Sequence, residues 1–481
     1  MVSPTVKQIW VIAGILMNML SQGLMLTFPY VLVPALQDPD SKIKADLNVA
    51  SWIASCVAIA GFPGFLASSI AMDRYGRKGA HIILMTPGLI GWICIYFSSN
   101  ITTLIIGRLL SGFTGAATVI LGAISIGEYS SPKNRGMFLN LKTAIVCLGN
   151  MSVHILANYM NWNLVALAAL VPQAVAFLIV LTWPESPAWL ASKRRFEASE
   201  KSFYWLRGKS AESKRELEEL IRAQKEKTAN VTSMSLSEKT LEFFNKFTKR
   251  DFIQPTLVIT FCGILLEACG RHYFAAYAMQ IIDEVTGTKT NSFYFTLGID
   301  TIITVSSLTS SILVRVMKRR TILFYTGFAA LFTLVCVCLY LFLSANGIVS
   351  KDKPWIPITM FSVYFILSNL GCTAIPLALM GELYPLAHRG AGSAVCGISL
   401  SIWLMIAMQL TPHLLVSIKV YGTFAVYGTA MFVSLLAMYY TLPETKDKTL
   451  QEIEYYFNFG KFRDETNDNE DEVKMKMLPA A

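Results

Sequence analysis

Two glutamates, Glu128 and Glu382, each stand seven residues before an arginine, Arg135 and Arg389. The two motifs lie 254 residues apart, and each falls between two long apolar stretches. An arginine fork can hold a carboxylate through two hydrogen bonds, and such a pair is only marginally stable in water, so it can form and break. A charged turn that recurs once per half predicts a duplicated membrane protein whose halves move against each other.

Two further motifs recur in the same order. The segment Asp73-Arg74-Tyr-Gly76-Arg77-Lys78 corresponds to Val314-Arg-Val-Met-Lys-Arg319 in the second half. The segment Pro184-Glu185-Ser corresponds to Pro443-Glu444-Thr. Three matched motifs in one order are hard to obtain by chance, and they support an internal duplication.

The composition is that of a polytopic membrane protein. Of the 481 residues, 54% are hydrophobic and only 15% are charged, and the mean hydropathy is +0.49. An ordinary soluble protein is therefore excluded. The net charge of +9 comes from short loops, which indicates a positive-inside bias and no nucleic-acid partner. All nine cysteines lie in apolar stretches, so we expect structural thiols, with no metal and no cofactor.

The fold class predicted is an all-α membrane protein with twelve transmembrane helices in two six-helix bundles, because about 20 apolar residues cross a bilayer. We expect one N-terminal bundle over residues 1–184, a cytoplasmic helical linker over 185–254, a second bundle over 255–442 and a cytoplasmic tail over 443–481. The predicted spans are 9–36, 49–72, 79–99, 102–127, 136–159, 163–183, 255–281, 291–314, 320–344, 355–381, 390–416 and 421–442.

The charges in alternate loops predict the topology. Arg74, Arg77 and Lys78 share one set of loops with Lys133, Arg135, Arg319 and Arg389, whereas the opposite set is nearly neutral. We therefore expect both termini to be cytoplasmic. A short amphipathic segment at residues 450–457 precedes a charged end of the chain, which we expect to be disordered.

These motifs resemble the sugar porter branch of the major facilitator superfamily along essentially the whole chain. The resemblance rests on the Asp73 motif, Gly107-Arg108, the two Glu and Arg-Gly pairs, Pro184-Glu185-Ser-Pro187 and Pro443-Glu444-Thr. The segment Val33-Pro-Ala-Leu36 is similar to one in the facilitated trehalose transporter group. The resemblance implies a plasma-membrane protein with a small solute, such as a sugar, and membrane lipid as its partners. The sequence does not predict its oligomeric state.

In that family the cytoplasmic charges form an intracellular gate. The resemblance assigns Asp73, Arg74, Arg77, Glu128, Arg135 and Glu185 to the gate of the first half, and Glu382, Arg389 and Glu444 to that of the second. The alternative is that these residues only anchor the loops and cap the helices. The second half departs from the pattern at Val314 and Met317, which replace an acid and a glycine, so we expect it to lock less firmly.

The resemblance is weaker in the substrate cavity, where the family's amides are mostly replaced. The candidates for substrate binding are Thr143, Glu267, His272, Tyr277, Asp300 and Trp403. Ionisable groups are costly inside a bilayer and are therefore candidate functional residues. The alternatives are that Glu267 pairs with Arg271 one turn away, that Asp300 borders a polar wall, and that Tyr277 and Trp403 pack in the core. We expect His81 and His154 to be satisfied or interfacial histidines.

The function predicted is facilitated diffusion of a trehalose-like or hexose-like sugar by alternating access, since the first span has no acid. One alternative is a proton-coupled carrier of a non-sugar solute that uses Glu267, His272 or Asp300. Another is a nutrient sensor that binds without transporting. The sequence shows no nucleophile and base pair, phosphate loop or metal spacing, so we do not expect an enzyme.

Overall fold

The computed structural model describes residues 3–210, 213–218, 220–222, 250–287, 291–349, 353–384, 389–446, 448 and 450–462. The regular structure of these residues is entirely helical. The first half contains α1 (Pro4–Thr27), α2 (Pro29–Gln37), α3 (Leu47–Tyr96), α4 (Ile101–Tyr129), α5 (Pro132–Tyr159), α6 (Trp162–Thr182), α7 (Pro187–Ser192) and α8 (Phe196–Arg207). The second contains α11 (Arg250–Ala268), α12 (Tyr273–Thr286), α13 (Ser292–Val316), α14 (Arg319–Ala345), α15 (Trp355–Ser368), the π-helical turn η1 (Asn369–Thr373), α16 (Ala374–Glu382), α17 (Arg389–Thr441) and α18 (Leu450–Phe459).

Short polar residues mark the starts of several helices. The Asp46 carboxylate accepts a hydrogen bond from the backbone N–H of Val49 at 2.9 Å and begins α3. The Asn100 side chain does the same for Thr103 at 2.8 Å and begins α4. These N-caps satisfy donors that have no partner inside the helix. The cap at Asn100 also lets α4 begin directly after the short turn that follows α3.

Among the residues that the structure describes, ten stretches are long and apolar enough to cross a membrane. Two of them, within α3 and α17, are 50 and 48 residues long, about twice the length a bilayer needs. Each is interrupted by one residue with non-helical backbone angles, Gly76 in α3 and Lys419 in α17. Dividing them there gives twelve segments, consistent with the predicted number.

Three of the predicted spans are not continuous helices. The first is divided at Phe28 between α1 and α2, the seventh at residues 269–272 between α11 and α12, and the tenth by η1. Backbone groups freed at such breaks must find partners inside the protein, because the lipid offers none. Breaks in membrane helices therefore mark places where the chain lines an internal space.

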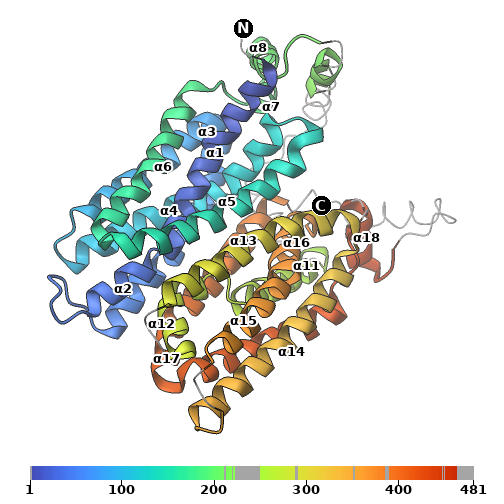
Figure 1. Cartoon of the computed structure of the whole chain (residues 1–481). Helices are drawn as coiled ribbons and strands as arrows, with labels where there is room; N and C mark the ends of the chain where they lie inside the picture. Colours follow the sequence, from blue (N-terminus) through green and yellow to red (C-terminus); the bar gives the residue numbers. More distant parts are fainter. Residues whose placement is uncertain are drawn as a thin grey trace.

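The helices form two groups that follow the chain order (Figure 1). The group α1–α8 packs against the group α11–α18 chiefly through α3 on α17 and α5 on α13. A hydrogen bond of 2.8 Å between the side chains of Ser55 and Gln409 joins α3 to α17. We call the end of the molecule that carries Gly76, α7, α8 and α18 the linker end.

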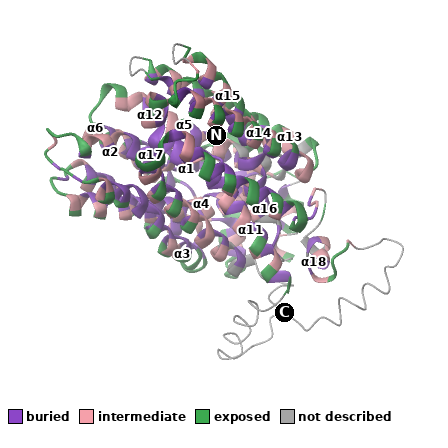
Figure 2. Cartoon of the chain, turned by 90° about the horizontal axis from the view of Figure 1, so that it is seen from below, coloured by how far each residue is buried: buried purple, intermediate pink, exposed green. Residues whose placement is uncertain are grey.

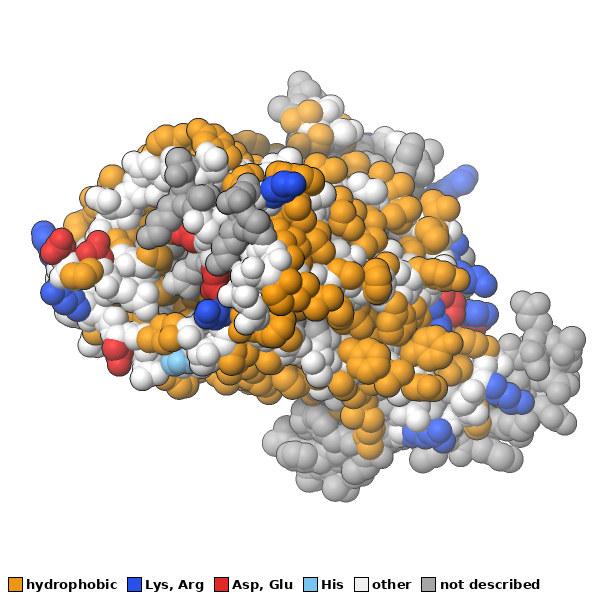
Figure 3. All heavy atoms as spheres, turned by 60° about the horizontal axis from the view of Figure 1, so that its bottom comes forward, with side chains coloured by type: hydrophobic (Ala, Val, Ile, Leu, Met, Phe, Trp, Pro, Cys, Tyr) orange, Lys and Arg blue, Asp and Glu red, His pale blue; other side chains and the backbone are white. Residues whose placement is uncertain are grey.

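Buried residues gather where the helices meet, and exposed residues cover the outward faces (Figure 2). Many of the exposed side chains are large and apolar, such as Tyr325 and Phe332 of α14, which are 78% and 72% exposed. On the face drawn in Figure 3, hydrophobic side chains form the broad central area, and most charged ones lie toward its two ends. An apolar girdle with charged ends is the surface expected of a protein surrounded by lipid.

The linker predicted over residues 185–254 stays a prediction, and its part at residues 185–210 contains the helices α7 and α8. Residues 223–249 lie outside the described part of the chain. The amphipathic segment predicted at residues 450–457 is confirmed as α18, which buries Ile453 and Phe457. The end of the chain predicted to be disordered, after residue 462, is also outside the described residues.

Candidate functional site

The Glu185 carboxylate caps the part of α3 that follows Gly76. It accepts hydrogen bonds from the backbone N–H groups of Arg77 at 2.6 Å and Lys78 at 3.1 Å. A carboxylate at a helix N-terminus satisfies unpaired donors and opposes the positive end of the helix dipole. The backbone of Gly76 has φ +81°, and a Cβ there would lie 2.4 Å from Glu185 Oε2. Glycine is therefore required by both the backbone angle and the close approach.

The Arg77 side chain joins this capped helix to α4. Its guanidinium donates to Glu128 Oε1 at 2.6 Å, and the two side chains are only 15% and 18% exposed. The hydroxyl of Ser186 donates to the other carboxylate oxygen of Glu128 at 2.5 Å. Glu128 thus accepts from α3 and from the segment after α6, so one carboxylate ties three parts of the first half together.

The second half repeats the capping arrangement. The Glu444 carboxylate accepts from the backbone N–H groups of Arg319 at 3.0 Å and Arg320 at 3.1 Å, at the start of α14. Met317, which occupies the position of Gly76, has φ −101° and extended backbone. The second turn therefore needs no glycine, which explains physically how the motif can depart from the family pattern there.

The other residues predicted for the gate are either exposed or have side chains outside the described part of the structure. Asp73 and Arg74 are exposed at the linker end. The side chains of Arg135, Glu382 and Arg389 lie outside the described part of the structure. The predicted pairing of Glu128 with Arg135, and of Glu382 with Arg389, therefore stays a prediction.

Tyr384 is a buried residue of the second charged turn. Its hydroxyl shares a hydrogen bond of 2.9 Å with Thr256 of α11. Burial raises the pKa of Tyr384 to about 12, and the Thr256 hydrogen bond opposes this only in part. The residue is therefore neutral at physiological pH and acts here through packing and hydrogen bonding.

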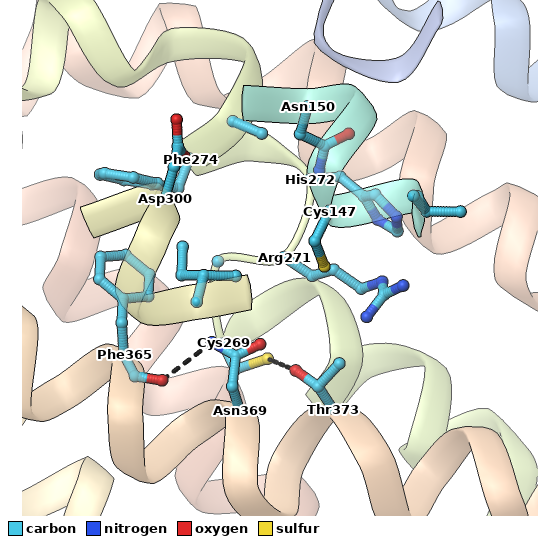
Figure 4. Close-up of a pocket in the computed structure, with 14 residues that line it drawn as sticks. Cys147, Asn150, Cys269, Arg271, His272, Phe274, Asp300, Phe365, Asn369 and Thr373 are labelled. Atoms are coloured by element: carbon cyan, nitrogen blue, oxygen red, sulfur yellow. Dashed lines mark hydrogen bonds between the residues drawn. The ribbon is translucent and has the colours of Figure 1, made fainter. Parts of the chain in front are cut away.

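A cavity lies between the two halves. Its lining comes from α5, from the break between α11 and α12, from α12 and α13, and from the end of α15 with η1. Figure 4 shows Arg271 and His272 of the break beside Cys147 and Asn150 of α5. The cavity volume is about 30 Å³, which has room for water but not for a sugar. The halves must separate before a larger solute can enter.

The two helix breaks that border the cavity have identifiable causes. Gly270 has φ +90° and follows the last turn of α11, where glycine ends helices most easily. In the tenth span, Pro376 has no N–H to donate to the carbonyl of Cys372, so the helix widens into the π-helical turn η1. Both breaks place polar groups at the cavity, including Thr373, whose hydroxyl contacts Cys269 Sγ at 3.7 Å.

Glu267 does not pair with Arg271 as predicted. Its Oε1 lies 2.7 Å from Nδ1 of His272. The prediction fails because α11 ends at Ala268, which takes Arg271 off the helical face that carries Glu267. His272 and Arg271 both line the cavity.

Asp300 of α13 pairs with His154 of α5, so this contact crosses between the halves. Asp300 Oδ2 lies 2.5 Å from His154 Nδ1, and His154 Nε2 donates to the carbonyl of Ala275 at 2.8 Å. Because Nε2 carries a proton, the second proton lies between Nδ1 and the carboxyl group. The pair is then either imidazolium and carboxylate or two neutral groups. His154 is satisfied, as expected, but its role in joining the halves was not predicted.

Three other predicted substrate residues do not line the cavity in this structure. Tyr277 is buried, and its hydroxyl donates to the carbonyl of Met408 at 3.0 Å. Trp403 is half-buried and packs against Gly263 of α11. Thr143 lies on α5, one turn from the lining residue Cys147. Tyr277 and Trp403 thus hold α17 against α11 and α12, which agrees with the packing alternative.

Sequence analysis missed two amides, Asn150 and Asn369, that line the cavity. With its amide oxygen and nitrogen exchanged, as the surrounding acceptors favour, Asn150 donates to the carbonyl of Gly23 at 3.0 Å and to the hydroxyl of Thr27 at 3.1 Å. Asn369 donates to the carbonyl of Phe365 at 2.9 Å. Both residues could have been found in the sequence as amides inside charge-free apolar stretches, because a polar group inside a membrane needs a hydrogen-bond partner.

These observations define a class: a multi-pass α-helical membrane protein in two halves, with a polar cavity between them bounded by broken helices. Residues 9–457 match the family described as "Sugar (and other) transporter". The chain belongs to that family.

Similar curated proteins include facilitated trehalose transporters. The Tret1 protein of Drosophila mojavensis is 26% identical over 410 residues, which are 85% of this chain and 46% of that protein. The Tret1 protein of Culex quinquefasciatus is 25% identical over 84% of this chain and 76% of that protein. This chain therefore spans about half the length of the Drosophila relative.

Solved structures share the fold. The proton:xylose symporter XylE bound to 6-bromo-6-deoxy-D-glucose has a TM-score of 0.74 at 15% identity, covering 95% of this chain and 100% of that one. The inward open conformation of XylE from E. coli has the same TM-score at 15% identity, covering 94% and 99%. The predicted all-helical transporter fold is thereby confirmed.

Proposed function

We propose that this protein carries a sugar or a similar polyhydroxylated solute across the membrane, down its gradient and without converting it, by alternating access. The observation that carries the proposal is the cavity between the halves, bounded by the break at residues 269–272 and by η1. Discontinuous helices at the repeat interface are where carriers of this type hold their solutes. The trehalose transporters among the relatives make trehalose the first solute to test.

The charged residues of the linker end would form the gate in this proposal. Glu185 and Glu444 cap equivalent helix starts, and the pair of Arg77 and Glu128 joins α3 to α4. Each contact lies within one half, so it would hold the linker end of that half together while the halves move against each other. The density of basic residues at this end favours a cytoplasmic location for it and for both termini, in the plasma membrane.

Uptake of labelled trehalose and glucose into vesicles containing the purified protein tests the proposal. We expect saturable uptake of at least one of the two sugars, at the same initial rate with and without a proton gradient. Vesicles without protein give the background. Absence of protein-dependent flux for both sugars would contradict the assignment to neutral sugars.

A second candidate is a proton-coupled carrier, which the pair of His154 and Asp300 favours. This pair holds a proton within a contact between the halves, so gain or loss of that proton would change how they adhere. Faster uptake under an inward proton gradient distinguishes this candidate from simple facilitated diffusion.

A further inference from the structure

One basic residue, Arg271, lines the cavity, and a second, Lys142 of the other half, lies one turn of α5 from the lining residue Val146. Lys142 lies four residues before Val146 and eight before Asn150 on α5, so it shares the helical face from which those two residues line the cavity. Arg271 lines the cavity from the break between α11 and α12 (Figure 4). The two cations are close enough to interact electrostatically. Like charges repel more strongly in a region with little water, so two neighbouring cations destabilise the protein unless a negative charge lies near them.

The nearby carboxylates are engaged elsewhere. Glu267 is paired with His272 at 2.7 Å and Asp300 with His154 at 2.5 Å. Within the described ranges, neither Lys142 nor Arg271 forms an ion pair with an acid. Among the described residues, the acceptor for Lys142 is the carbonyl of Val119, at 2.9 Å.

Arg108 shows how this chain satisfies a buried arginine that serves only structure. Its guanidinium donates to the carbonyls of Met25 at 2.7 Å, Ala54 at 3.2 Å and Ile53 at 3.3 Å. For the Arg271 side chain, the described part of the protein provides no hydrogen bond of this kind. Its donors face the cavity, where a ligand could accept from them.

The charge of the site follows from these contacts. The pair of His154 and Asp300 sums to zero whichever group holds the shared proton. The pair of Glu267 and His272 sums to zero or to one negative charge, depending on whether His272 is protonated. With Lys142 and Arg271 protonated, the region keeps a net positive charge in either case. An uncompensated positive charge inside a membrane protein is energetically unfavourable, and an anionic ligand would neutralise it.

We propose that the cavity binds a solute that carries a carboxylate or phosphate group beside its hydroxyls, with Arg271 as the anion-binding residue and Lys142 as a second positive charge. This inference rests on the proposed carrier function and narrows its substrate class. The guanidinium fork matches the two oxygens of either anion. Hydroxyl groups of the solute would meet the polar side chains of Asn150, Asn369 and Thr373.

Three probes with the same sugar ring test the inference in vesicles with the purified full chain: D-glucose, D-glucuronate and D-glucose 6-phosphate. They differ only at the sixth carbon, which carries a hydroxyl, a carboxylate or a phosphate. We expect one anion to be transported, or to inhibit transport, at a concentration about tenfold lower than glucose. The two anions distinguish a carboxylate from a phosphate as the preferred group.

Variants then locate the effect. Arg271→Gln should weaken binding of the anion about tenfold or more, and by a larger factor than it weakens binding of glucose. Arg271→Lys should retain most of the preference, because the charge remains. Lys44→Gln is the matched control, since it removes one positive charge from an exposed loop between α2 and α3. Should Arg271→Gln fail to fold, Lys142→Gln and competition on the unmodified protein still decide the question.

The outcomes separate this inference from the proposed function. Neutral-sugar flux that neither anion shares nor inhibits overturns the inference and leaves the carrier assignment in place. An equal loss for glucose and anions in Arg271→Gln also overturns it. Transport of an anion without transport of glucose supports the inference, and the anion then replaces the neutral sugar as the proposed substrate. Flux of no probe, with no competition, overturns both.

Discussion

The Glu128 carboxylate is the residue on which the first charged turn depends. It accepts from Arg77 of α3 and from Ser186 after α6, and it is only 18% exposed. Buried charge-assisted hydrogen bonds contribute more than surface pairs, because their loss leaves the partner unsatisfied.

Glu128→Gln keeps the side-chain shape and removes the charge that Arg77 requires. We expect the free energy of unfolding to fall by about 1 to 3 kcal/mol. Thermal unfolding of the purified protein measures the change. Glu197→Gln, at an exposed position in the first turn of α8, is the control and should have little effect. Equal melting temperatures for the two variants would contradict a structural role for the Arg77 pair.

Gly76 gives a second test at the scale of one residue. Ala at this position would need φ +81° and would place its Cβ 2.4 Å from Glu185 Oε2. We expect Gly76→Ala to destabilise by about 1 to 3 kcal/mol, through strain and the displaced cap. Gly127→Ala is the matched control, because its Cβ would meet no atom within 4 Å. Thermal unfolding should show a loss only for Gly76→Ala, and similar losses in both would refute the capping account.

At the scale of helices, the lengths of the spans were predictable and the breaks within them were only partly so. Apolar stretches and capping residues such as Asp46 and Asn100 are local signals. The break after Ala268 depends on Gly270, but isolated glycines also occur inside continuous membrane helices such as α4. Proline disturbs membrane helices in several ways, so Pro376 alone does not indicate a widened turn such as η1.

The candidate site was predicted less well for a similar reason. The matched acids Glu185 and Glu444 could be found as repeated motifs, although their capping of helix starts needed the folded turn. The partners of Asp300 and Glu267 could not be inferred. One is His154, 146 residues away, and the other is His272, which reaches Glu267 only because the helix ends between them. Contacts across the two halves have no signature in local spacing.

The contact between α5 and α13 makes a testable prediction about pH. The pair holds one shared proton, so gain of a second proton or loss of the shared one would weaken the contact between His154 Nδ1 and the Asp300 carboxyl group. We expect the initial rate of transport to vary with pH. In Asp300→Asn this dependence should flatten, because a neutral amide can donate to Nδ1. Tyr30 packs against His154 with ring centroids 4.2 Å apart and would remain in place.

Initial uptake rates measured in vesicles with equal pH on both sides would show this effect. Glu267→Gln serves as a comparison, since Glu267 pairs within its own half. An unchanged pH profile in Asp300→Asn would exclude this contact as the titrating element. A flattened profile only in Glu267→Gln would assign the pH response to the pair of Glu267 and His272 instead.

At the scale of the whole molecule, two halves meet along α3 with α17 and α5 with α13, around a cavity of about 30 Å³. A solute the size of a sugar does not fit that volume, so binding requires the halves to separate. Interfaces of packed helices switch between discrete arrangements rather than deforming continuously. Alternating access follows if each arrangement opens the cavity to a different side of the membrane.

Counterflow tests this central claim most directly. Vesicles containing the protein are loaded with unlabelled solute, either trehalose or whichever probe shows flux, and then diluted into a trace of the labelled form. An alternating carrier should transiently accumulate label inside the vesicles above its equilibrium level. The internal unlabelled solute occupies the carrier and so slows the exit of label, and the loaded carrier also returns faster than the empty one. Uptake that only approaches equilibrium, at a rate unaffected by preloading, would contradict alternating access.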